Sequence, residues 1–279
     1  MGLGTETEHR RRITDLAEMG DLPAGSPFRQ MGNNFIDPSH WCSIFGVSET
    51  DSLPHRMPQG MDLILSAAPI MISAPEHHPG RTQDTDGTAA GSESVKREPL
   101  AAKSIVHDSH ILFPLPSHLN GEPFTVGSLL RLAKAAYLND SRDEQKRQRF
   151  PISDSTLSYL LDNKKIYDHS AEESAWVLLV KESPSVFFGE GLESQQATAN
   201  AIGHGYRQTS LIALLTGMFL MHFQSGERLS NGIYLRCAGD AGQGLCFVAG
   251  FVPVGMAVSS IGQNGKSAQL GYSLCRVFS

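Results

Sequence analysis

The sequence predicts an α+β protein in which a C-terminal antiparallel sheet packs around a buried central helix, preceded by a largely disordered N-terminal arm. Three observations carry this prediction: a long apolar stretch at Leu211–Phe223, a series of short β-rich segments after it, and a change of composition near residue 104. The division separates residues 1–104, expected to be a mostly flexible arm with short apolar docking islands, from residues 105–279, expected to form one globular domain.

The apolar stretch Leu211–Phe223 reads LIALLTGMFLMHF and is apolar at ten of its thirteen positions. Leucine and methionine favour helix, and the stretch lacks the β-branched residues of a buried strand. Ser210 is placed to cap a helix that runs to about Gln224, and Gly226 is placed to end it. A helix that is apolar on nearly all sides is expected to be surrounded by other elements. The stretch is shorter than the roughly 20 apolar residues that a membrane span requires.

Four β-rich segments follow the central helix, separated by glycine-rich or polar turns. Short turns between consecutive strands favour antiparallel pairing. The segments are Gly232–Ala238, Leu245–Val252, Val254–Ile261 and Gln269–Phe278.

Ahead of the central helix, the spacing of apolar residues predicts helices mixed with extended segments. The predicted helices are Val126–Leu138, a short one over 154–162, and Glu193–Ile202. The predicted extended segments are Ile111–Leu115 and Ser174–Lys181, the second expected to continue through Val186–Phe188.

The N-terminal arm holds nine of the fifteen prolines. Pro75–Leu100 has hardly any large apolar residues, so burial cannot offset the entropy of ordering it, and a linker is expected. Two apolar islands, Phe35–Val47 and Met61–Ser73, interrupt the arm. Such islands are typical of docking segments, either for the chain's own domain or for a partner.

Composition limits the classes of function. The net charge of −6 gives no electrostatic reason to expect nucleic-acid binding. Four scattered cysteines do not form a disulfide framework, and no secretory signal is visible near the N-terminus. A soluble protein is expected, either cytoplasmic or exported without a cleavable signal peptide; the oligomeric state is left open.

Cys246 is a candidate nucleophile because it follows the glycine-rich turn Gly242–Gly244, whose backbone N–H groups can stabilise an oxyanion. His204, which lies between two glycines, and His222 on the central helix are the candidate bases, with Asp240 or Glu190 to orient one of them. The alternative interpretation is that Cys246 is a small core residue, whose pKa an apolar strand raises.

The sequence gives weaker support for two other kinds of site, a metal site and a DNA-binding surface. His107 and His110 with Asp108 are a usable ligand set, but their segment is not clearly helical and no metal site is predicted. The basic run Arg142–Arg149 lies between two predicted helices that are too far apart for a helix-turn-helix. No cofactor-binding residue is predicted, since neither glycine-rich turn has a phosphate-binding spacing.

A flexible arm in front of one domain, without a convincing catalytic set, favours a non-enzymatic interaction protein of the effector type that binds a protein partner. The first alternative is a cysteine-dependent hydrolase or transferase that uses Cys246 with His204 or His222. The second alternative is a DNA-binding accessory protein.

Overall fold

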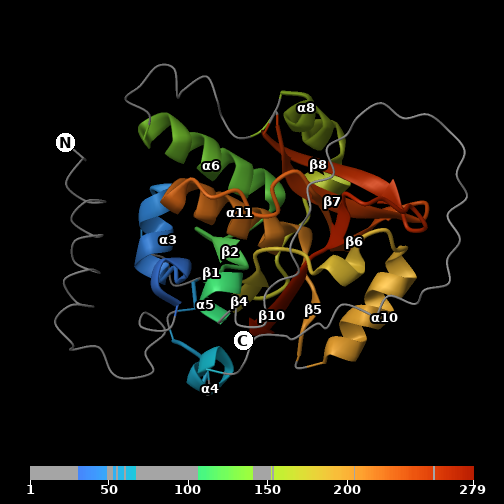
Figure 1. Cartoon of the computed structure of the whole chain (residues 1–279). Helices are drawn as coiled ribbons and strands as arrows, with labels where there is room; N and C mark the ends of the chain where they lie inside the picture. Colours follow the sequence, from blue (N-terminus) through green and yellow to red (C-terminus); the bar gives the residue numbers. More distant parts are fainter. Residues whose placement is uncertain are drawn as a thin grey trace, which may run out of the picture.

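The computed structural model describes residues 31–48, 53–54, 56–59, 61–66, 106–140, 152, 154–203, 205–253 and 255–279. These residues form two four-stranded sheets on either side of one long helix, α11 (Leu211–Ser225) (Figure 1). The predicted α+β class and the buried central helix are confirmed. Within this part of the chain, every helix is too short or too polar to cross a membrane.

The central helix α11 begins and ends as its sequence predicts. The hydroxyl of Ser210 accepts a hydrogen bond from the backbone N–H of Ala213, and Gly226 ends the helix in the left-handed conformation, with φ of 74°. All residues from Leu211 to Met221 are buried. A Cβ atom at Gly217 would lie 2.6 Å from Cδ2 of Leu179, so this glycine lets the helix approach the first sheet closely.

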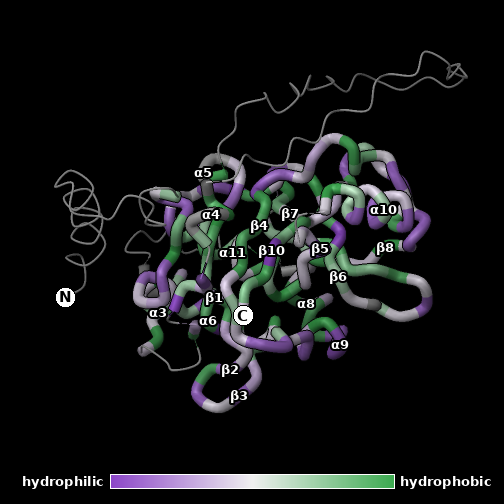
Figure 2. Tube along the Cα trace, turned by 90° about the horizontal axis from the view of Figure 1, so that it is seen from below, coloured by the Kyte–Doolittle hydropathy of each residue, from purple (hydrophilic) through white to green (hydrophobic). Residues whose placement is uncertain are grey.

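The first sheet has the strand order β1-β4-β10-β5, with antiparallel pairing throughout. Its inner face packs on α11, and its central strand β4 is almost entirely buried. Figure 2 shows the hydrophobic colour of β4 near the middle of the molecule. The strands are β1 (His110–Leu115), β4 (Ala175–Val180), β5 (Arg207–Gln208) and β10 (Leu274–Phe278).

Residues from the N-terminal islands complete the core. The ring of Phe35 stacks on Trp176 of β4 with centroids 5.8 Å apart, and the N–H of Ile36 donates to the carbonyl of Leu112 at 2.9 Å. Trp41 and Phe45, on helix α3 (Pro38–Phe45), are buried against α6 and α11. The first island therefore docks on the chain's own domain, and so does the described part of the second, α4 (Met61–Ser66), which packs in the same cluster as Phe35.

The second sheet has the order β8-β7-β6-β9 and packs its inner face on α11. The expected antiparallel meander is confirmed for its first three strands, whereas β9 pairs parallel to β6. The prediction of a single strand over Gln269–Phe278 is wrong. This segment forms two strands that belong to different sheets and are separated at Ser273. The strands are β6 (Tyr234–Gly242), β7 (Leu245–Val252), β8 (Gly255–Gly262) and β9 (Leu270–Tyr272).

The predicted outer helices are present as α6 (Val126–Asp140), α8 (Asp154–Asp162) and α10 (Leu192–Ile202). The expected strand Val186–Phe188 is wrong, because residues after Pro184 turn into a 3-10 helix, η2 (Ser185–Phe187), which buries Phe187 against Tyr272. The smaller elements are η1 (Gly32–Asn34), α5 (Val106–Ser109), β2 (His118–Leu119), β3 (Glu122–Pro123) and α9 (Lys164–Tyr167).

Several sequence predictions fall outside the residues that the structure describes. They include the linker Pro75–Leu100, the basic run Arg142–Arg149, His204, and the side chains of His107, Asp108 and Asp240.

Candidate functional site

Cys246 lies on the outer face of the second sheet, the face turned away from α11. Side chains alternate along a strand, and Phe247, Ala249 and Phe251 of β7 pack in the main core. Cys246 and Val248 therefore point to the opposite side. The Cys246 thiol is 2% exposed and donates to the carbonyl oxygen of Ile261 at 3.5 Å.

Burial raises the pKa of the Cys246 thiol, although the neighbouring guanidinium of Arg236 acts in the opposite direction. A nucleophilic cysteine needs a lowered pKa in a partly exposed position. Neither condition is met at Cys246, which resembles a core thiol more closely than an activated one.

The structure does not bring His222 to Cys246. The ring of His222 contacts Phe251 on the inner face of the second sheet, with centroids 5.6 Å apart. Phe251 lies five residues along β7 from Cys246, roughly 16 Å of strand, and on the other face. Burial lowers the pKa of His222, and its Nδ1 atom is buried without a hydrogen-bond partner among the described residues.

The histidine-rich segment considered for metal binding holds a buried hydrogen-bond chain. Nδ1 of His110 is hydrogen-bonded to Oγ of Ser109 at 2.7 Å, and Nε2 is hydrogen-bonded to the hydroxyl group of Tyr206 at 2.9 Å. Burial lowers the pKa of His110 to about 4, so the ring is neutral at physiological pH. Across the part of the chain that the structure describes, no three side chains of the histidine, cysteine and carboxylate types gather as a metal site.

The outer face of the second sheet also carries a fully buried arginine, Arg236 on β6. Its Nη1 group donates to the carbonyl of Glu190 at 3.0 Å and to Oε1 of Gln195 at 2.6 Å. Its Nη2 group donates to the backbone carbonyls of Gln263 and Gly265. A buried cation normally requires a paired charge or several hydrogen-bond acceptors. Arg236 has acceptors at both Nη groups, whereas its Nε is buried without a partner among the described residues.

Arg236 thereby fixes residues 263–269, which we name the crossing loop. Gly262 at the end of β8 pairs with Leu245, whereas Leu270 pairs with Tyr234 at the opposite end of β6. The connection must therefore run back across the outer face. Further backbone hydrogen bonds join the crossing loop to Gly189 and Leu192. The loop is thus held along its length by the sheet and by α10.

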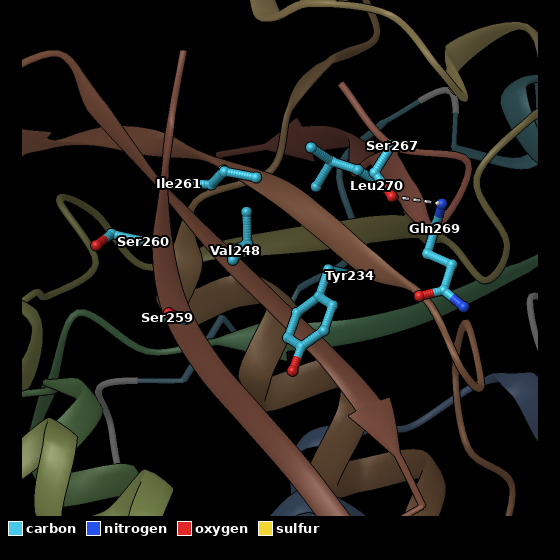
Figure 3. Close-up of a pocket in the computed structure, with 8 residues that line it drawn as sticks. All are labelled: Tyr234, Val248, Ser259, Ser260, Ile261, Ser267, Gln269 and Leu270. Carbon is cyan, nitrogen blue, oxygen red and sulfur yellow. Dashed lines mark hydrogen bonds between the residues drawn. The ribbon is translucent and has the colours of Figure 1, made fainter. Parts of the chain in front are cut away.

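A pocket of about 240 Å³ opens beside the crossing loop (Figure 3). Its floor is apolar and its rim carries hydroxyl and amide groups, while none of the described residues that line it bears a formal charge. The ring of Tyr234 lies in the middle of the group, between β7 and Gln269. The lining residues are Tyr234, Val248, Ser259, Ser260, Ile261, Ser267, Gln269 and Leu270.

The sequence did not point to Arg236 or to this pocket. Its lining residues are ordinary strand and turn residues, and four different strands and the crossing loop bring them together. The available signal was the arginine at the centre of the β-rich segment Gly232–Ala238, since a charge in a buried strand requires dedicated partners.

Comparison of the chain with protein-family models, with curated proteins and with solved structures finds no match.

Proposed function

We propose that this chain is a non-enzymatic interaction protein of the effector type, and that the pocket beside the crossing loop receives an uncharged apolar side chain of a protein partner. The observation that supports this proposal is a preformed, uncharged pocket whose wall is held by a buried arginine. Pockets with an apolar floor and a few polar groups at the rim are typical binding sites.

The chemistry of the lining limits the partner. An ionised side chain would lose its hydration in this pocket without meeting an opposite charge, at a cost of several kcal/mol. Leucine, isoleucine, methionine or phenylalanine would bury apolar surface against Tyr234 and Ile261, the half-buried apolar residues of the lining. The hydroxyl and amide groups at the rim would then bind backbone groups of the same partner segment.

Selection from a random peptide library on the immobilised full chain tests this proposal. The selected peptides are compared by fluorescence polarisation on the wild type, on Ser259→Arg, which places a charged side chain at the pocket, and on Ser158→Arg, a matched control on the exposed side of α8. We expect peptides with an uncharged apolar anchor, and at least tenfold weaker binding to Ser259→Arg alone.

Equal binding of the peptides to Ser259→Arg and to the wild type would overturn the proposal, as would a selection that enriches no sequence. The melting temperatures of both variants are measured alongside, so that a folding defect is not mistaken for lost binding.

A further inference from the structure

A second surface feature lies on the outer face of the first sheet, away from the pocket. The guanidinium carbon of Arg276, on β10, lies 5.7 Å from the ring centroid of Tyr206 and 5.3 Å from that of Phe278. All three side chains are half-buried. Cation–π contacts with the two aromatic rings hold the guanidinium in place without using its N–H donors.

A chain of hydrogen bonds fixes the position of the Tyr206 ring. The hydroxyl group of Tyr206 is hydrogen-bonded to Nε2 of His110, and the other nitrogen of His110 to Ser109. Gly205 lies against the guanidinium edge, where a Cβ atom would be 3.7 Å from Nε of Arg276. With φ of 74°, this glycine gives the chain a turn that other residues rarely adopt, and it places no side chain beside the guanidinium of Arg276.

The donors of Arg276 are unoccupied within the described structure. Arg236 donates to four acceptors, and Lys181 pairs with Glu227 at 2.8 Å. No described residue accepts a hydrogen bond from Arg276 or lies within ion-pair distance of it. A half-buried guanidinium that is oriented by two rings and has free donors is arranged to bind a group of opposite charge.

We propose that Arg276, held between Tyr206 and Phe278, is an oxyanion-binding site that takes a carboxylate or a phosphate group. Two parallel N–H donors of a guanidinium match two oxygens of either group. His110, whose pKa burial lowers, is neutral at physiological pH and adds no charge to that of Arg276. The pocket on the second sheet takes no part in this site, so the two proposals stand or fall separately.

Titration of the full chain with inorganic phosphate and, separately, with acetate tests the site. The arginine Nε–Hε signals are followed by NMR at constant ionic strength, with sodium chloride as the reference salt. The Arg276→Gln and Arg228→Gln variants assign the two signals that are compared. Arg228 is the matched control because, among the described residues, its guanidinium contacts the ring of Phe251 alone, at 5.8 Å, and it lies in an exposed position.

We expect the Arg276 signal to shift along a saturating curve with at least one of the two anions, while the Arg228 signal follows the chloride reference. Saturation with phosphate alone identifies a phosphoryl ligand, and saturation with acetate alone identifies a carboxylate. Linear shifts of the same size at both arginines would overturn the proposal. The wild-type titration decides the outcome even if Arg276→Gln folds poorly.

Discussion

Arg236 donates a 2.6 Å hydrogen bond to Oε1 of Gln195, and neither side chain is exposed to solvent. This contact joins β6 to α10, while Nε2 of Gln195 donates to the carbonyl of Phe187. The buried charge is thus surrounded by neutral acceptors instead of a carboxylate. Such an arrangement favours the observed placement of the loops over the sheet, because their carbonyl groups accept from the buried Nη groups.

Replacement of Arg236 by methionine is expected to lower the free energy of unfolding by about 3 kcal/mol, because it leaves several buried acceptors without a donor. Urea denaturation measures the change. The control is Arg228→Met, an exposed position where a change within about 0.5 kcal/mol is expected. A loss at Arg236 no larger than at Arg228 would contradict the role assigned to the buried guanidinium.

Gly250→Ala is expected to destabilise the second sheet by about 3 kcal/mol, since the added Cβ would lie 1.9 Å from the carbonyl oxygen of Ile233 and backbone must move. The neighbouring strand offers a control in Gly262→Ala, where nothing lies within 4 Å of the added atom. Thermal unfolding of both variants checks the prediction. Similar melting temperatures would show that β6 and β7 are less closely packed than described.

Acidification is expected to destabilise the protein through His110. Burial lowers its pKa to about 4 in the folded state, whereas the unfolded residue keeps its ordinary value of 6.5. The unfolded state therefore binds more protons between these values, and the full contribution is present only above pH 6.5. About 3 kcal/mol is lost as the pH falls to 4.

The measurement for His110 is the pH dependence of urea unfolding in the wild type and in His110→Gln. Burial also lowers the pKa of His169 and His222, so the variant should keep part of the acid sensitivity. An identical slope in both proteins would refute the assignment to His110.

Cysteine alkylation distinguishes the cysteine-dependent alternative from a core role. All four cysteines are buried, and burial raises the pKa of Cys237, Cys246 and Cys275. We expect slow labelling of every thiol at mildly acid pH until the protein unfolds, as read by peptide mass mapping. Fast labelling of Cys246 alone would restore the catalytic hypothesis.

Trp41→Ala is expected to cost about 4 kcal/mol, because its buried ring packs on Phe45 and Phe124. Trp41→Phe should cost much less, since the indole N–H has no hydrogen-bond partner among the described residues. Chemical denaturation of the two variants tests both values. A small loss for Trp41→Ala would mean that the N-terminal island contributes little to the core.

Patterns within one segment were predictable from the sequence. Capping residues and uniform apolarity defined α11, and regular spacing defined α6 and α10. The division at Ser273 was not predictable, because Leu270–Phe278 alternates as one strand does, and only the three-dimensional pairing shows that two sheets share it. Contacts between distant segments also decide where the island around Trp41 packs, so the sequence left its position open.

The candidate site was less predictable than the fold. The glycine-rich turn before Cys246 is present in the structure. Its residues Gln243 and Gly244 close a hairpin between β6 and β7, however, and do not expose the thiol. The local sequence determines the conformation of a turn, whereas the exposure of a side chain depends on which distant residues cover it. The contacts of Arg236 join residues 27 to 46 positions apart, and the pocket joins residues from four strands, which no local pattern reports.

The segment Leu270–Phe278, which both sheets share, affects how the protein folds. It contributes one strand to each sheet, and β9 must find β6 across a separation of 36 residues, from Tyr234 to Leu270. Neither sheet is complete before this segment has been synthesised, and pairing between distant segments slows folding. The two sheets are therefore expected to acquire their final structure together, in one late and cooperative step.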